Sequence, residues 1–290
     1  MNMGRFSIKK DSIIKLFICC LVIFTAFYVL AQFYHRPNIR PPEGEIWVHF
    51  IDVGQGDCIL IQSADNAVLI DAGTVAASRI VTTYLDNLGI TSLDYVVATH
   101  PHSDHIGGMP AVINRYSISE FWMPDVVHTT HIFEDMLNAL EANNIQITMV
   151  QAGDIISAGI IEMTAVAPNR SFYQNLNNYS VVLHMKHGNT AMLFTGDAEA
   201  LSENEIMAEW NVESDVIKIG HHGSRTSSTY RFLNAVGASA AVITVGAGNR
   251  FGHPHGEVID RLNDMGIVIK RTDELGTIVL ITDGENIYAK

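Results

Sequence analysis

The chain has few cysteines and few positive charges for its length. Only three of its 290 residues are cysteine: Cys19 and Cys20 in an apolar N-terminal segment and Cys58 in an expected strand. No disulfide framework is implied, and no thiolate competes for a metal site. The 18 basic residues face 31 acidic ones, for a net charge of −13. This argues against nucleic-acid binding over the whole surface. It does not exclude a metallonuclease, because bound metal ions bring their own positive charge.

The first 36 residues differ in character from the rest. An apolar run begins at Ile13 and extends to Tyr34, behind Arg5, Lys9 and Lys10. Its length approaches the roughly 20 residues that cross a bilayer, and the positive flank favours a cytoplasmic N-terminus. We therefore expect residues 1–36 to form an uncleaved single-pass anchor in the cell membrane, with an extracellular catalytic domain. The alternative is a cleaved signal peptide and a secreted protein, although no small-residue cleavage site is obvious.

The remaining chain predicts a short linker and one folded domain. Residues 37–45 are rich in proline and are typical of a stiff linker. Residues 46–290 have the length and the mixed pattern of a single α/β domain, without an internal repeat. Helices are expected over residues 76–88 and 132–143 and from Ile106 onward, and a hairpin turn is expected at Gly188-Asn189.

A dense group of metal-ligand side chains follows the strand expected at residues 93–98. Within six positions the chain carries His100, His102, Asp104 and His105. In such a loop the first two side chains are expected to face one way and the last two another, which suits two neighbouring metal ions. The alternative is a polar loop whose histidines are satisfied by hydrogen bonds. Four ligand-type side chains at this spacing favour the metal site.

The motif H-x-H-x-D-H resembles the signature of the metallo-β-lactamase fold hydrolases. From about Ile46 to the C-terminus the chain is also similar, in order, to the ComEC-like branch, named for the extracellular hydrolase domain of bacterial DNA-uptake channels. The segments that carry this likeness are Gly54-Gln55-Gly56-Asp57, Ile70-Asp71-Ala72-Gly73, Phe194-Thr195-Gly196-Asp197, Gly220-His221-His222-Gly223-Ser224, Gly252-His253-Pro254 and Arg271-Thr272-Asp273. The resemblance implies an αββα sandwich that holds two divalent ions, Zn²⁺ or Mn²⁺, with His and Asp ligands.

The resemblance also implies a role for each later ligand. Asp197 would bridge both ions, the alternative being a turn-forming Asp after Gly196. One of His221 and His222 would complete the shell of the second ion, and the sequence does not choose between them. The other would contact a substrate phosphate or polarise the bound hydroxide. Asp71 would accept a hydrogen bond from a ligating imidazole, with a simple turn role as an equal alternative.

One departure from the wider fold concerns the first ion. Many members supply a third histidine before the bridging Asp, whereas this chain has Asn175-Leu176-Asn177-Asn178-Tyr179-Ser180, which resembles the replacement in the ComEC-like branch. The first ion is then expected to be held by His100, His102, Asp197 and water.

Further side chains are assigned to the cleft. Asn177 and Asn178 are expected to contact substrate, as are Asp57 in its glycine-rich turn and Ser224. His253 is expected to act as general acid, the alternative being a surface histidine. Basic residues near the later motifs could add to the positive potential of the cleft, but their ordinary role is solvation: Lys218, Arg225, Arg231, Arg250, Lys270 and Arg271.

The sequence therefore predicts a metallohydrolase in which a hydroxide between two ions attacks a phosphorus or carbonyl centre, with Asp104, His222 and His253 as catalytic residues. Phosphodiester hydrolysis ranks first, on extracellular DNA or on phosphorylcholine of cell-wall polymers, with DNA-uptake machinery as a partner. A choline pocket needs an aromatic cage, for which the chain offers Trp122, Tyr173, Tyr179 and Phe251. A β-lactamase, a lactonase-like hydrolase and an anchored binding module without turnover are the alternatives.

Overall fold

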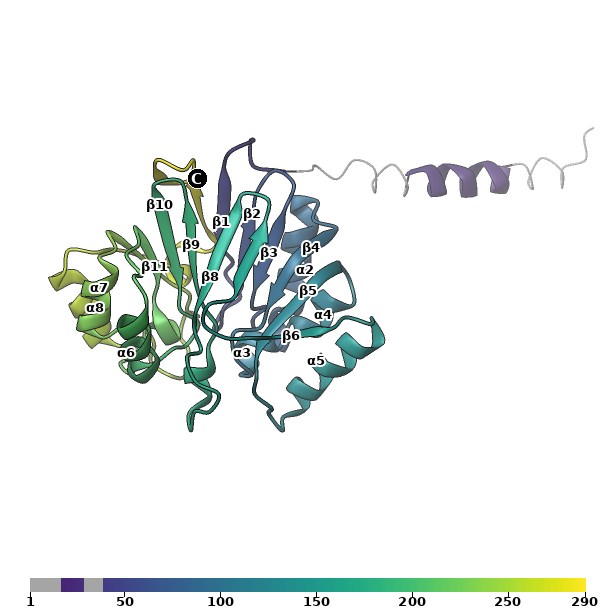
Figure 1. Cartoon of the computed structure of the whole chain (residues 1–290). Helices are drawn as coiled ribbons and strands as arrows, with labels where there is room; N and C mark the ends of the chain where they lie inside the picture. The colour runs from purple at the N-terminus through teal and green to yellow at the C-terminus, as the bar shows by residue number, and fades with distance from the viewer. Residues whose placement is uncertain (1–16, 29–38) are drawn as a thin grey trace, which may run out of the picture.

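The computed structural model describes residues 17–28 and 39–290 (Figure 1). Residues 17–28 are helical. Among the described residues, no helix has both the length and the apolar character that a membrane crossing requires. The span expected over residues 13–34 and the linker expected at residues 37–45 lie partly outside the described residues and stay predictions.

Two mixed sheets form the centre of the domain. The first has the order β15-β14-β1-β2-β3-β4-β5-β6, with β1 Ile46–Phe50, β2 Ile59–Gln62, β3 Ala67–Ile70, β4 Ser92–Val97, β5 Ser117–Pro124, β6 Ile147–Val150, β14 Ile278–Thr282 and β15 Ile287–Ala289. The second has the order β13-β12-β11-β10-β9-β8-β7, with β7 Ile155–Ala158, β8 Ile161–Ala167, β9 Val182–His187, β10 Thr190–Phe194, β11 Val216–Lys218, β12 Ala240–Ile243 and β13 Val268–Arg271.

Helices cover the outer face of each sheet. They are α2 Ser78–Leu88, α3 Ser103–Ile106, α4 Met109–Ile113, α5 His131–Ala142, α6 Ala200–Glu209, α7 Tyr230–Val236, α8 Gly256–Asp264 and α9 Thr272–Leu275, with short turns η1 Val75–Ala77, η2 Leu176–Tyr179 and η3 Gly220–Gly223. Figure 1 shows α2, α4 and α5 beside the first sheet and α6, α7 and α8 beside the second. Three apolar clusters fill the spaces between these four layers, so the domain has the αββα order that the resemblance implied.

Local sequence explains several elements as expected. α2 ends at Leu88 and is capped by Gly89, whose φ of 77° is a left-handed conformation that glycine adopts without strain. β9 and β10 pair antiparallel across Gly188-Asn189, with His187 opposite Thr190, which confirms the predicted hairpin.

The prediction that a helix begins at Ile106 is wrong. α3 already begins at Ser103 inside the histidine motif, and the chain bends before α4 begins at Met109. The bend lies at Gly107 and Gly108, where a Cβ atom would approach the Val75 nitrogen to 2.4 Å and the Ala72 oxygen to 2.2 Å. Close backbone packing against the chain after β3 therefore divides one expected helix into two short ones.

The parallel strands place the ligand motifs together. β3, β4, β5 and β6 are parallel neighbours in the first sheet, as are β10, β11, β12 and β13 in the second. Their carboxyl ends therefore lie at one edge of each sheet. The ligand motifs follow the carboxyl ends of these strands. Asp71 and His100 follow β3 and β4 of the first sheet, and Asp197 and His221 follow β10 and β11 of the second.

A buried histidine of β1 generates a prediction for stability. Burial and the nearby Lys290 lower the pKa of His49 to about 3, and its Nδ1 lies 2.8 Å from the Tyr84 hydroxyl. In the unfolded chain this imidazole takes up a proton near pH 6.5, whereas in the folded chain it stays neutral down to about pH 3. Its contribution to stability is therefore lost as the pH falls through this window, at up to about 1.4 kcal/mol per pH unit.

Substitution of His49 tests this contribution. We expect His49→Leu to flatten the decline of the unfolding free energy between pH 6.5 and pH 3, as measured by urea denaturation. The control His131→Leu removes an exposed histidine and is expected to keep the slope of the natural chain. Equal slopes in all three proteins would contradict the assignment.

Candidate metal centre

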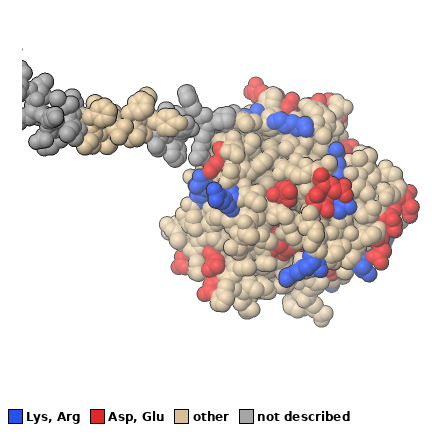
Figure 2. All heavy atoms as spheres, turned by 180° about the vertical axis from the view of Figure 1, so that it is seen from behind, with Lys and Arg blue, Asp and Glu red and all other residues tan. Residues whose placement is uncertain are grey.

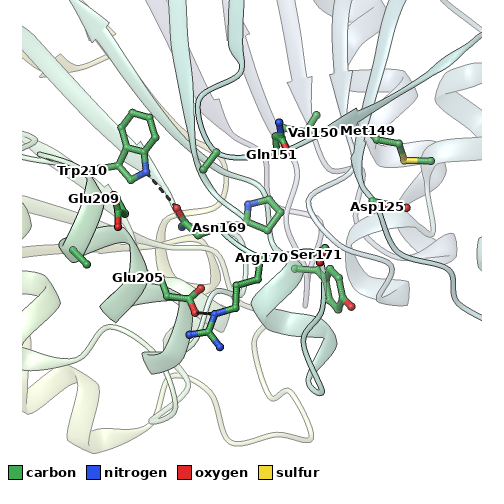
Figure 3. A pocket seen from close by; sticks show the side chains of 14 residues that line it. Asp125, Met149, Val150, Gln151, Asn169, Arg170, Ser171, Glu205, Glu209 and Trp210 are labelled. Carbon is green, nitrogen blue, oxygen red and sulfur yellow. Dashed lines mark hydrogen bonds and ion pairs between the residues drawn. The ribbon is translucent and has the colours of Figure 1, made fainter.

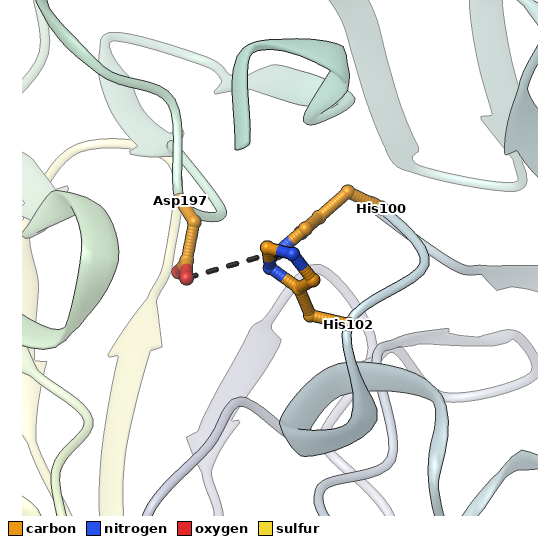
Figure 4. A group of neighbouring side chains, drawn as sticks. All are labelled: His100, His102 and Asp197. Atoms are coloured by element: carbon orange, nitrogen blue, oxygen red, sulfur yellow. Dashed lines mark hydrogen bonds and ion pairs between the residues drawn. The ribbon is translucent and has the colours of Figure 1, made fainter. Parts of the chain in front are cut away.

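The first group of ligand atoms comes from the loop after β4. His100 Nε2 and His102 Nδ1 lie 2.9 Å apart, and Asp197 Oδ2 lies 3.8 Å from His100 Nε2. Figure 4 shows the two imidazoles pointing toward each other and toward the carboxylate. Burial lowers the pKa of both His100 and His102. Both rings are therefore neutral and keep lone pairs available for a metal ion.

The second group lies on the other side of Asp197. Its members are Asp104, His105 and His222, whose ligand atoms lie within 4.8 Å of one another. Asp197 Oδ1 is 3.3 Å from His105 Nε2 and 3.5 Å from His222 Nε2. The two oxygens of Asp197 thus face different groups, which is the arrangement expected of a bridging carboxylate.

Hydrogen bonds hold Asp197 and the segment before β9 against the histidine loop. The Asp197 amide donates to Ser180 Oγ at 3.0 Å, and the Val181 amide donates to the Thr99 carbonyl at 2.9 Å. Gly196 precedes Asp197 with a φ of 51°, and a Cβ atom there would approach Ser180 and Thr99 to 3.1 and 3.2 Å. A glycine before the carboxylate is therefore required by the close approach of these two chain segments.

Two hydrogen bonds orient the imidazoles of the second group. His105 Nδ1 donates to Asp71 Oδ2 at 2.7 Å, and His222 Nδ1 donates to the Thr244 carbonyl at 2.9 Å. Each bond fixes the ring so that Nε2 faces Asp197. The structure thereby places His222, and not His221, in the second group, and it places Asp71 where a hydrogen bond to a ligating imidazole was expected.

Three buried polar atoms at this point have no hydrogen-bond partner. They are His105 Nε2, His222 Nε2 and Asp197 Oδ1. Unpaired buried polar atoms are rare in folded proteins because each one loses its solvation. Two imidazole nitrogens and a carboxylate oxygen are suitable ligands for Zn²⁺ and Mn²⁺. The donor set therefore fits a divalent metal ion.

The carboxylates govern the charges of the second group. Burial alone would disfavour a charged His222, but Asp197 and Asp57 raise its pKa to about 9. Burial likewise opposes charge on His105, whose pKa is raised well above its ordinary value by Asp197 and Asp71. Without metal, protons on these rings balance the buried negative charge, and a metal ion would have to displace them.

Asp57 does not face an open cleft. It is 1% exposed and forms an ion pair with the buried Lys218, whose ammonium also donates to the Gly196 carbonyl at 2.8 Å. Asp57 also accepts a hydrogen bond from Thr244 and lies 3.3 Å from His222 Nδ1. This placement disfavours the expected contact with substrate and gives Asp57 a supporting role beneath His222.

The expectation that Lys218 is solvated is wrong. β11 ends at Lys218, and its side chain lies inside the domain between Asp57 and Asp197, 3.9 Å from the latter. The hydrophobic residues before it, Val216 and Ile217, identify a buried strand. They give no sign that its last residue would pair with a carboxylate from the loop between β1 and β2.

His221 belongs to a neighbouring polar network. Its side chain is 23% exposed, Nε2 lies 3.6 Å from Asp197 Oδ2, and Nδ1 lies 3.4 Å from Glu199 Oε1. Glu199 also accepts hydrogen bonds from Asn177 at 3.0 Å and from Thr226 at 3.0 Å. Burial would raise the pKa of Glu199, but the contact with His221 and the bonds from Asn177 and Thr226 hold it below its usual value. No motif in the sequence indicated Glu199, although it lies two positions after Asp197.

The other predicted substrate contacts differ in their surroundings. Asn177 reaches toward His221, with 3.3 Å between Nδ2 and Nδ1, and Ser224 Oγ lies 3.0 Å from Thr226 Oγ1. Asn178 is turned away, because its Oδ1 accepts from the amides of Glu199 and Ser202 near the start of α6. Only Asn177 and Ser224 therefore border the network around His221.

His253 lies beside both later histidines, with ring centroids 5.4 Å from His221 and 6.5 Å from His222. Burial and the neighbouring imidazoles lower the pKa of His253 to about 4. Without metal this ring is neutral near pH 7, and the expected role of His253 as proton donor stays a prediction. Its Nδ1 is buried and has no hydrogen-bond partner.

Positive backbone φ angles gather at this site. Asp71, His221 and His222 have φ values of 57°, 50° and 54°. Such angles are uncommon for residues other than glycine and carry strain that the surrounding structure must hold. The strained backbone turns the two imidazoles of η3 in different directions, His222 into the buried group and His221 toward the network with Glu199.

The hydrogen bond from His105 to Asp71 generates a prediction. We expect Asp71→Asn to weaken metal binding roughly 10- to 100-fold, because the amide no longer fixes and polarises the imidazole. Asparagine tolerates a positive φ, so the fold is expected to persist. Competition with a chelating dye measures the affinity for Mn²⁺ and Zn²⁺. The control Asp94→Asn alters a carboxylate of β4 that binds the Ala67 amide; equal affinity in both variants would contradict the role of Asp71.

The buried pair of Lys218 and Asp57 generates a second prediction. We expect Lys218→Met to lower the unfolding free energy by about 3–5 kcal/mol, because it leaves a buried carboxylate without its partner. The double variant Lys218→Met/Asp57→Asn is expected to lose less. Lys186→Met, on the exposed side of β9, is the control. Urea denaturation measures all three, and a loss under 1 kcal/mol for Lys218→Met would refute this account.

Known proteins resemble the chain over most of its length. ComE operon protein 3 of Bacillus subtilis is 30% identical over 295 residues, which cover 94% of this chain and 37% of that protein. Competence protein ComA of Neisseria gonorrhoeae is 32% identical over 274 residues, which cover 87% of this chain and 35% of that protein. The chain thus spans about a third of the length of these relatives and is homologous to the ComEC-like proteins.

Solved structures and family profiles agree on the fold. The metallo-beta-lactamase fold protein YhfI of Bacillus subtilis superposes with a TM-score of 0.54 at 15% identity, covering 82% of this chain and 99% of that one. At this identity the likeness concerns the fold alone. Residues 51–246 match the profile described as the metallo-beta-lactamase superfamily. The chain therefore belongs to the metallo-beta-lactamase superfamily.

Proposed function

We propose that this chain hydrolyses phosphodiester bonds with the help of two divalent metal ions. The observation that carries the proposal is the position of Asp197, whose two carboxylate oxygens face two separate groups of ligand atoms. The first ion would be held by His100 and His102, and the second by Asp104, His105 and His222, with Asp197 shared. Such a pair of ions, when bound, activates water and neutralises the charge of an anionic substrate.

The chain's own side chains would orient the substrate. His221 is held at Nδ1 by Glu199, and its Nε2 lies on the side of Asp197. When both ring nitrogens carry protons, Nε2 is placed to donate a hydrogen bond to a phosphate oxygen at the first group. Asn177 and Ser224 support this histidine directly and through Thr226. The fixed positions of these groups lower the entropic cost of aligning the substrate.

The charge of the surface favours a substrate that reaches the metal centre as a single strand or a small molecule. The net charge is −13, and the face seen in Figure 2 carries basic and acidic side chains interspersed, without a broad basic patch. A long duplex requires many phosphate contacts from clustered lysine and arginine. A short single strand or a small phosphodiester presents fewer phosphates, so the local positive potential of the metal site accounts for a larger share of its binding.

A second candidate substrate is a choline phosphodiester, and one pocket favours it. This pocket, of about 680 Å³, lies between β6, the loop after β8 and α6, and contains Trp210 with the carboxylates of Asp125, Glu205 and Glu209. Figure 3 shows the Trp210 indole and the ion pair of Arg170 with Glu205. An aromatic ring beside carboxylates suits a quaternary ammonium group.

Of the four aromatic residues that the sequence offers for a cage, only Tyr179 lines this pocket. Trp122 and Tyr173 are both only 4% exposed: Trp122 packs in the core between the sheets, and Tyr173 donates a hydrogen bond to Glu205. Tyr179 does line the pocket, and η2, to which it belongs, also carries Asn177 at the metal centre. Phe251 lies elsewhere, on an exposed loop.

The N-terminal segment and the known relatives support proposals on location and partners. We propose that residues 1–36 anchor the chain in the cell membrane, with the catalytic domain on the outer side, or that they direct its secretion. The proposal is supported by the apolar run behind basic residues. The similarity to competence proteins supports a partnership with DNA-uptake machinery.

Hydrolysis by the full chain in detergent micelles tests the proposal. With Mn²⁺ or Zn²⁺ supplied, we expect cleavage of linear single-stranded DNA, and we expect Asp197→Asn to reduce it by at least the roughly 10- to 100-fold that is lost when a partner of a metal ligand is removed. The control Asp65→Asn removes an exposed carboxylate and is expected to keep full activity. p-Nitrophenylphosphorylcholine is assayed in parallel.

Each outcome of this assay separates the candidates. Release of nitrophenol with DNA intact would replace the nuclease with the choline esterase. The absence of hydrolysis with both substrates would refute phosphodiester hydrolysis and favour a lactonase-like hydrolase or an anchored binding module.

A further inference from the structure

An exposed aromatic ring lies on the loop between β12 and α8. Phe251 is 48% exposed, and its ring is nearly parallel to that of His253, with centroids 5.7 Å apart and an interplanar angle of 24°. The guanidinium carbon of Arg250 lies 5.0 Å from the centroid of Phe251. Within the part of the chain that the structure describes, no ion pair of Arg250 is found. A flat apolar ring and an available cation therefore lie side by side.

This loop borders the metal centre. The ring of His253 lies between those of Phe251 and His222. Its centroid is 5.7 Å from the centroid of Phe251 and 6.5 Å from that of His222. His253 is also 5.4 Å from His221. A nucleoside attached to a phosphate at the metal centre could therefore reach Phe251.

The loop is held firmly in place. The Asn249 carboxamide donates to the carbonyls of Gly246 and His253, and it accepts from the amides of Phe251 and His253. The amide of His255 donates to the Gly223 carbonyl at 2.9 Å. The bonds of Asn249 fix the loop internally, and the bond to Gly223 connects it to η3, which carries His221 and His222. Phe251 is thus presented in a defined position, which lowers the entropy lost when a ligand packs against it.

We propose that Phe251 is a stacking platform for one base of a single-stranded nucleic acid, and that Arg250 contacts a neighbouring phosphate. This inference rests on the proposed phosphodiesterase function and names its substrate class. Bases stack on aromatic side chains without regard to sequence, because every base has a π face. Phe251 has no polar group with which to read a base edge, so the platform selects for unpaired bases and not for a sequence.

The resting position of Arg250 is consistent with this role. Its guanidinium lies over the ring, where a cation is attracted to the π electrons. An entering base replaces it on the ring, and the exposed arginine side chain turns toward the phosphate backbone. A duplex keeps its bases stacked inside, so it offers the ring no partner. The platform therefore favours single strands over duplexes.

Binding and cleavage by the full chain test the platform. Fluorescence anisotropy compares a labelled oligothymidine strand with an abasic strand of equal length, without added metal. We expect the natural chain to bind the strand with bases roughly 10-fold more tightly. Phe251→Ala is expected to abolish this preference, and Phe251→Trp is expected to restore it. The control Tyr288→Ala removes an exposed aromatic residue of β15 and is expected to keep the preference.

The same variants are then compared with Mn²⁺ by following cleavage of the two strands. A loss of preference in Phe251→Ala with Mn²⁺-dependent cleavage present would support both proposals. Equal affinity of the natural chain for both strands, or an unchanged preference in Phe251→Ala, would overturn the platform even if DNA is cleaved. Preferential binding without cleavage of any phosphodiester would refute the proposed function and leave the platform standing.

Discussion

The structure depends on keeping one buried carboxylate between two groups of imidazoles. Asp197 is 1% exposed, and its oxygens face His100 on one side and His105 and His222 on the other. A buried carboxylate is tolerated only with compensating charge or hydrogen bonds. Protonated rings of the second group provide this charge without metal, and metal ions would provide it in the working enzyme. Fold stability and metal chemistry thus share the same atoms.

A buried ion pair lies next to the ligand group that faces Asp197. Lys218 ends β11, and Asp57 lies in the loop between β1 and β2; they pair next to His222. Asp71 and the Thr244 carbonyl fix the rings of His105 and His222. The positive φ angles of Asp71 and His222 show that backbone strain is concentrated in the same place. The surrounding packing holds this strain, and the ligand atoms are positioned before any ion binds.

The sequence predicted what depends on local pattern and motif order. The period of α2 with its stop at Gly89, the hairpin at Gly188-Asn189 and the αββα fold are all found. Contacts between segments that are distant in the chain could not be predicted from the sequence. The close approach of Gly107 and Gly108 to the chain after β3 divides a helix, and the burial of Lys218 depends on a carboxylate of the loop between β1 and β2. The choice of His222 over His221 likewise follows from backbone angles that single residues do not encode.

The central claim is that two ions bind on either side of Asp197. Anomalous diffraction from crystals of the full chain soaked in Mn²⁺ tests it most directly. The account predicts two peaks, one among His100, His102 and Asp197 and the other among Asp104, His105, His222 and Asp197. A single peak, or peaks that do not share Asp197, would contradict it.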